Sequence, residues 1–206
     1  PHHLVRGGLD FFRSEEPWHV LDGPVHPDDL GGRGVERVGI STNAALLDEA
    51  REKGYAFWPA LISEAQACLE SGWGAKAAGN ALFGIKADAS WEAAGGTIVL
   101  QDTTEVVHGK RILYKAAQHP ELCSFRAYAT PEEAFRDHAA FLRRNPRYAP
   151  CFAHARSDVE GWAASLDICG YSTDHTDQDG DPRYSVKLLQ LVASVRKRLP
   201  LIGVKP

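Results

Sequence analysis

Two carboxylates in this sequence lie where they could carry out acid–base chemistry. Glu70 ends a predicted helix, on a face shared with Ile62 and Gln66 and beside an apolar stripe. Partial desolvation of a carboxyl group disfavours its charged form, which suits a general acid near neutral pH. Glu105 lies in a β-rich segment, and a strand can hold a carboxylate rigidly across a groove from a helix end. Glycoside hydrolysis needs at least two carboxyl groups, which flank the glycosidic bond that is cut.

Aromatic side chains near turns and element ends are a second kind of candidate. Their faces can stack on the apolar faces of pyranose rings, as in sugar-binding clefts. The aromatic candidates are Trp73, Phe83, Trp91, Tyr128 and Tyr171. Exposed glutamates and core aromatics are both common, so on position alone each of these residues also has a structural interpretation.

Helices are predicted to position most of these residues. Pro59 suits a first helical turn and Gly72 a helix end, which bounds the helix that carries Glu70. Capping boxes at 130–133 and 157–160 open two further helices. The predicted helices cover residues 44–53, 59–71, 130–144, 157–169 and a last segment that opens at 181–182.

A β-hairpin lobe is predicted between these helices. Residues 97–100 and 105–107 are β-rich, His108-Gly109 suits a tight turn, and residues 111–114 return. Residues 124–128 add a short extended piece. Because no repeat or low-complexity linker interrupts the chain, the sequence predicts one mainly helical domain with a hairpin lobe.

Composition excludes several classes of protein. The chain has 206 residues, 44% hydrophobic and 24% charged, which excludes disordered, collagen-like and coiled-coil proteins. A net charge of −4 argues against nucleic acid as the main partner. No apolar run approaches the roughly 20 residues of a membrane span. We therefore expect neither a nucleic-acid partner nor a membrane span.

Neither a cofactor nor a metal is expected. The four cysteines, at positions 68, 123, 151 and 169, form no C-x-x-C pair, and no H-E-x-x-H spacing occurs, so a zinc-dependent amidase is disfavoured. One or two disulfides are compatible with the sequence if the protein works outside the cytoplasm, but the pairing stays open.

The chain divides into three parts. Residues 1–7 resemble the remnant of a purification tag and protease site, and residues 8–40 are predicted to form an irregular arm rich in glycine, proline, aspartate and histidine. Residues 41–206 form the predicted catalytic domain.

A series of motifs resembles the family 73 glycoside hydrolases, which are peptidoglycan β-N-acetylglucosaminidases found in flagellar rod-associated hydrolases, autolysins and lysins. Residues 65–74 are similar to the family's AQAALESGWG segment, with Glu70 as its glutamate. Five further motifs follow in the family's order, at residues 79–86, 103–109, 125–128, 137–149 and 170–174. Together the six motifs cover about residues 43–195.

The resemblance implies an α+β, lysozyme-like fold, mainly helical, in which a β-hairpin lobe flanks a substrate groove. It implies that Glu70 is the general acid, Glu105 the second carboxylate, and Tyr171 a residue near the substrate's acetamido group. The expected substrate-binding residues are Trp73, Asn80, Phe83, Trp91, Tyr128 and Asp174.

The implied activity is that of an endo-β-N-acetylglucosaminidase, which cuts the β-1,4 bond between N-acetylglucosamine and N-acetylmuramic acid in peptidoglycan glycan strands. Retaining, inverting and substrate-assisted mechanisms all stay open. A muramidase or lytic transglycosylase is one alternative. A non-catalytic wall-binding module is another, although the presence of both glutamates weighs against it.

The expected location is the periplasm or the extracellular cell wall. A flagellar enzyme, an autolysin, a phage lysin and a toxin delivered into a rival's periplasm are all compatible with the motifs. In the last case an immunity or inhibitor protein would be a partner.

The sequence departs from the family pattern at three places. Residues 116–122 are interpreted as an enlarged end of the hairpin. Ala81 replaces the second asparagine of the family's GNNLFG motif. Residues 175–181 form an acidic insertion after Asp174, whose alternating aspartates resemble calcium ligands. An EF-hand would need a glycine where Pro182 lies and a glutamate where Leu188 lies, so a solvated loop is the favoured interpretation.

Overall fold

The computed structural model describes residue 52 and residues 59–107, 110–155, 157–172 and 183–198. The predicted arm, the helix at 44–53, the turn at 108–109, Asp174 and the acidic insertion lie outside these residues, apart from residue 52 itself. None of the described helices is long and apolar enough to cross a membrane.

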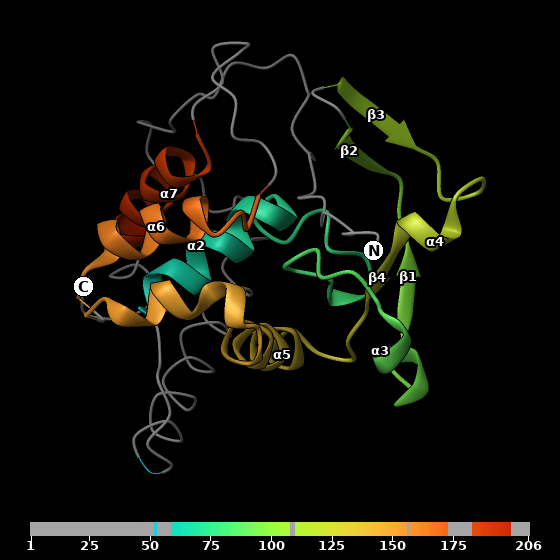
Figure 1. The fold of residues 1–206 in the computed structure, drawn as a ribbon, viewed down its shortest axis with the longest axis horizontal. Helices are drawn as coiled ribbons and strands as arrows, with labels where there is room; N and C mark the ends of the chain where they lie inside the picture. The colour runs from blue at the N-terminus through green and yellow to red at the C-terminus, as the bar shows by residue number, and fades with distance from the viewer. Residues whose placement is uncertain (1–51, 53–58, 108–109, 156, 173–182, 199–206) are drawn as a thin grey trace.

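Helix α2 (Ala60–Ser71) is the centre of the helical lobe and packs on α6 (Val159–Ile168) and α7 (Tyr184–Arg198), as Figure 1 shows. Gly72 ends it in the left-handed conformation, with φ at 57°, as predicted. Every residue from Ile62 to Ser71 is buried, where the sequence predicts one apolar stripe. The difference arises because neighbouring elements enclose the helix, so its polar side chains are also interior.

Helix α5 (Pro131–Arg144) and the 3-10 helix η3 (Pro146–Ala153) complete the helical lobe. Thr130 is the N-cap of α5, as predicted, and its side chain accepts a hydrogen bond from the Glu133 backbone N–H. The capping box is only half formed, because the Glu133 carboxylate accepts from the Ala129 N–H, at 3.0 Å, and not from that of Thr130. The side chain that caps α6 is Asp158, which accepts a hydrogen bond from the Gly161 N–H at 2.9 Å. The predicted capping box beginning at Ser157 was therefore wrong by one residue.

The β part consists of two small antiparallel sheets. Strands β2 (Thr103–Val107) and β3 (Lys110–Tyr114) form the predicted hairpin, with Glu105 opposite Ile112. Strand β1 (Ile98–Leu100) pairs instead with β4 (Ser124–Arg126), so its assignment to the hairpin was wrong. The short helix α4 (Pro120–Cys123) brings the chain back to β4. Two further short helices, η2 (Ala78–Asn80) and α3 (Ala89–Ala93), link α2 to this region.

A buried arginine joins the β part to the helical lobe. Arg126, at the end of β4, is 6% exposed and donates to both carboxylate oxygens of Asp137 on α5, at 3.2 and 3.0 Å. Its other terminal nitrogen meets Asp88, the N-cap of α3, at 2.9 Å. Tyr128 donates to the same Asp137 carboxylate at 2.8 Å. One guanidinium thus fixes three elements relative to one another.

Replacing Arg126 is expected to destabilise the fold. Arg126→Met leaves the Asp137 carboxylate, whose side chain is 14% exposed, without its main counter-ion and should lower the free energy of unfolding by about 3 kcal/mol. Arg144→Met is the matched control, since the Arg144 side chain is 68% exposed and lies 3.6 Å from Asp137, and should cost less than about 1 kcal/mol. Urea denaturation measures both, and equal losses would contradict the assignment.

Candidate active site

Glu70 lies in the last turn of α2 and is 7% exposed, so its carboxyl group is held in the interior. The Tyr184 hydroxyl, from the first turn of α7, donates a hydrogen bond to Glu70. The Gln66 side-chain amide, one turn before Glu70, donates to the same hydroxyl at 3.1 Å. Burial raises the pKa of Tyr184, and the negative charge of Glu70 raises it further, so the phenol stays neutral.

Tyr171 lies next to this pair. Its ring stacks on that of Tyr184 with centroids 5.6 Å apart and contacts that of Tyr148 at 5.9 Å. Its hydroxyl is 3.2 Å from the Nε2 atom of His138, a fully buried residue of α5. The structure therefore brings Tyr171 and Glu70, which are far apart in the sequence, into contact with the same residue, Tyr184.

Glu105 comes from the other lobe. Its side chain is 15% exposed, with one oxygen 3.1 Å from the Lys86 ammonium and 3.4 Å from the Thr103 hydroxyl. Lys86 also donates to the Leu122 carbonyl and lies over the Phe125 ring, 4.1 Å from its centroid. Burial lowers the pKa of Lys86, and the Glu105 charge opposes this effect. Figure 1 shows β2 and β3 on one side of the end of α2 and helices α6 and α7 on the other.

Four residues expected to bind substrate have structural roles. Phe83 is 4% exposed and lies parallel to the His138 ring, with centroids 3.9 Å apart, and Tyr128 is 8% exposed. These two rings offer little surface to a sugar, which corrects the stacking prediction for both. The Asn80 side-chain amide donates a hydrogen bond to the Tyr128 carbonyl at 2.9 Å. The Arg198 guanidinium lies 3.9 Å from the centroid of the Trp73 ring, which packs on the α2–α7 contact.

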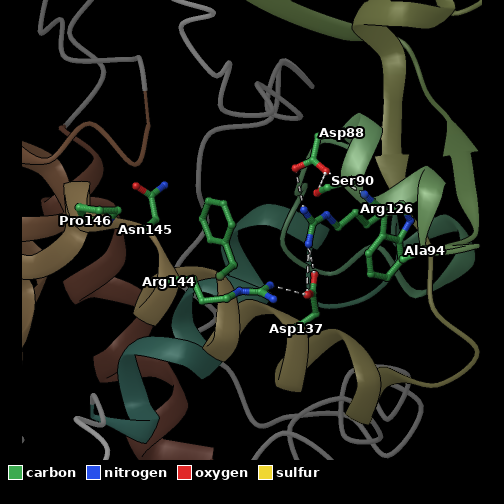
Figure 2. Close-up of a pocket in the computed structure, with 10 residues that line it drawn as sticks. Asp88, Ser90, Ala94, Arg126, Asp137, Arg144, Asn145 and Pro146 are labelled. Carbon is green, nitrogen blue, oxygen red and sulfur yellow. Dashed lines mark hydrogen bonds and ion pairs between the residues drawn. The ribbon is translucent and has the colours of Figure 1, made fainter.

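Trp91 lines a separate groove of about 680 Å³ along α3, α5 and the start of η3 (Figure 2). Its indole N–H donates to the Thr97 carbonyl at 2.8 Å, and the Arg126 guanidinium lies 4.9 Å from the ring centroid. The groove is lined by Asp88, Ser90, Trp91, Ala94, Arg126, Asp137, Phe141, Arg144, Asn145 and Pro146. Because Glu70, Glu105 and Tyr171 are absent from this lining, the groove is distinct from the site around Tyr184.

Sequence reasoning did not identify Tyr184, Lys86 or His138 as site residues. Tyr184 follows the acidic insertion and lies beyond the last of the six motifs. Lys86 and His138 lie inside matched motifs, but neither has a local pattern that indicates its partner. These contacts could be found only from the packing.

Residues 46–197 match the glucosaminidase family, described as mannosyl-glycoprotein endo-beta-N-acetylglucosaminidase. The chain is 36% identical over 137 residues to the peptidoglycan hydrolase FlgJ of Vibrio cholerae, which covers 64% of this chain and 36% of that protein. An autolysin of Enterococcus faecalis is 30% identical over 139 residues, which cover 66% of this chain and 17% of the autolysin. The chain thus spans little more than a third of the FlgJ relative.

Solved structures of similar chains confirm the lysozyme-like α+β fold. A peptidoglycan hydrolase mutant from Sphingomonas sp. A1 superposes with a TM-score of 0.61 at 28% identity, covering 81% of this chain and 95% of that one. The C-terminally truncated glycoside hydrolase domain of Salmonella typhimurium FlgJ gives 0.53 at 29% identity, with 82% and 97% covered.

The buried imidazole beside Tyr171 is expected to make stability depend on pH. Burial lowers the pKa of His138 to about 3, below its ordinary value of 6.5, so between these values the unfolded chain binds the extra proton. Its contribution to stability is complete above about pH 6.5 and falls as the pH is lowered. Between pH 6 and 4, wild type should lose up to about 1.4 kcal/mol per pH unit more than His138→Phe in urea denaturation. Equal slopes for the two proteins would contradict the neutral buried state.

Proposed function

Because this chain belongs to the glucosaminidase family, the family 73 glycoside hydrolases, we propose that it is an endo-β-N-acetylglucosaminidase acting on peptidoglycan. The bond cut is the β-1,4 link between N-acetylglucosamine and N-acetylmuramic acid. The observation that carries the proposal is the cluster of Glu70, Tyr184 and Tyr171 at the end of the matched helix motif.

Glu70 is the general acid in this proposal. Tyr184, a neutral phenol, holds one carboxyl oxygen, so the other oxygen is the one to deliver a proton to the glycosidic oxygen. Because Glu70 and Tyr184 are both buried, water competes little for this hydrogen bond. As the bond breaks, positive charge develops on the sugar ring in an oxocarbenium-like transition state.

Glu105 is the second carboxylate in this proposal. The Lys86 ammonium at 3.1 Å orients one of its oxygens, whereas Glu70 has a phenol in the equivalent place. This difference in neighbours suits Glu105 to stabilise positive charge or to activate water. Tyr171, positioned by His138, would face the acetamido group of the sugar.

The relatives named as peptidoglycan hydrolases and an autolysin support the periplasm or the cell wall as the place of action. Peptidoglycan glycan strands are the proposed partner. The inhibitor protein expected for a delivered toxin stays a prediction.

Glu70→Gln should reduce release of dye-labelled peptidoglycan fragments by at least about 100-fold, because it removes the transferable proton. Glu160→Gln, an exposed substitution on α6, is the matched control and should leave the rate within about twofold. The thermal midpoint of Glu70→Gln should stay near that of wild type. Near-normal activity in Glu70→Gln would show that another group is the acid, and absence of release by wild type would favour a wall-binding module.

The reducing ends of the released peptidoglycan fragments identify which glycosidic bond is cut. Mass spectrometry of digests, after borohydride reduction of the new ends, should show reduced N-acetylglucosamine at the reducing termini. Reduced N-acetylmuramic acid would instead indicate a muramidase, and 1,6-anhydro ends a lytic transglycosylase.

A further inference from the structure

Two of the four cysteines meet where η3 packs on the end of α6. Cys151 lies in η3 and is fully buried, whereas Cys169 directly follows α6 and is partly exposed. Cys169 packs against the buried core cluster that contains Cys151, and the two thiol groups interact with each other. The sequence left the pairing of the cysteines open, and the structure brings these two together.

Residues before and after Cys151 in the sequence make contacts that hold η3 against α6 and the residues that follow α6. The Arg147 guanidinium donates to the Cys169 carbonyl, and the Tyr148 ring contacts that of Tyr171, with centroids 5.9 Å apart. After Cys151, the Phe152 ring contacts that of Trp162 on α6 edge-to-face, with centroids 5.0 Å apart. The proximity of the two cysteines therefore follows from the packing of η3 along α6 and the residues after it.

The other two cysteines lie elsewhere. Cys68 is in α2 and packs with Val195 of α7, and Cys123 ends α4, with its sulfur 3.5 Å from the Tyr114 carbonyl. Both are almost fully buried, at 2% and 0% exposure. Neither lies on the η3–α6 contact that brings Cys151 and Cys169 together.

We propose that Cys151 and Cys169 are a disulfide site, closed by a disulfide oxidant such as oxidised glutathione or an oxidising thiol–disulfide oxidoreductase. The bond joins η3 to the segment that carries Tyr171, two residues after Cys169. This inference concerns the fold and does not depend on the proposed activity.

The reaction proceeds by two exchanges. The more accessible Cys169 thiolate attacks one sulfur of the oxidant, which gives a mixed disulfide and releases the first oxidant thiolate. Cys151 then loses its proton and attacks the Cys169 sulfur, which forms the protein disulfide and releases the second thiolate. Two electrons and two protons pass from the cysteines to the oxidant. Burial raises the pKa of the Cys151 thiol to about 12, which makes it the slower nucleophile and places it second in this order.

The bond closes a loop over residues 152–168, and such a cross-link stabilises a protein mainly by restricting its unfolded chain. The oxidised protein should melt about 5–10 °C above the same protein in dithiothreitol. The melting temperature of each protein is compared with that of its own reduced form. Any loss of stability that a cysteine substitution itself causes therefore cancels in this difference.

The test uses the whole chain, oxidised with a glutathione redox buffer and then alkylated. Non-reducing tryptic mapping should show peptide 148–156, which contains Cys151, linked to peptide 157–183, which contains Cys169. Cys151→Ser and Cys169→Ser should each lose both this species and the melting shift. The double variant Cys68→Ser/Cys123→Ser is the control and should keep both.

Three results would overturn the proposal. The first is that wild type remains reduced, or carries only glutathione on Cys169. The second is that the linked peptides contain Cys68 or Cys123. The third is that oxidised and reduced wild type melt at the same temperature.

Discussion

The hydrogen bonds from Gln66 to Tyr184 and from Tyr184 to Glu70 are the interactions on which the site depends. Helix α2 is buried along nearly all of its length, so its polar side chains lose their contact with water. A buried polar group costs about 1–3 kcal/mol if it has no partner. Helix α7 supplies this partner through one tyrosine in its first turn. The packing of α7 on α2 therefore also determines the position of the proposed acid.

A row of rings extends this arrangement into the rest of the helical lobe. Tyr184 stacks on Tyr171, Tyr171 meets Tyr148, and Tyr148 meets Phe141, with successive centroids 5.6 to 5.9 Å apart. The row begins on α7 and passes through η3 to α5. His138 adds a polar contact to it, because its imidazole is buried and bonded to the Tyr171 hydroxyl. Interior packing and a polar site are thus built from the same side chains.

Features with local causes could be predicted from the sequence. The ends of α2 and α5 depend on Gly72 and Thr130, whose effects act within one turn. The start of α6 was misplaced because Ser157 and Asp158 are both good N-caps and only the folded backbone selects one of them. The pairing of β1 was missed because a β-rich run indicates a strand but does not identify its partner. Phe83 and Tyr128 were assigned to the sugar because sequence shows a ring but not what covers it.

The sequence by itself determined the family, the helix that carries Glu70, the hairpin that carries Glu105 and the order of the motifs between them. Each of these depends on residue types within a short stretch of chain. The tertiary structure alone decided that Tyr184, 118 residues after Gln66, bonds with it, that Lys86 meets Glu105, and that Cys151 lies against Cys169. Such contacts join residues far apart in the chain, and they form only when whole helices and strands pack, since no local propensity specifies a distant partner.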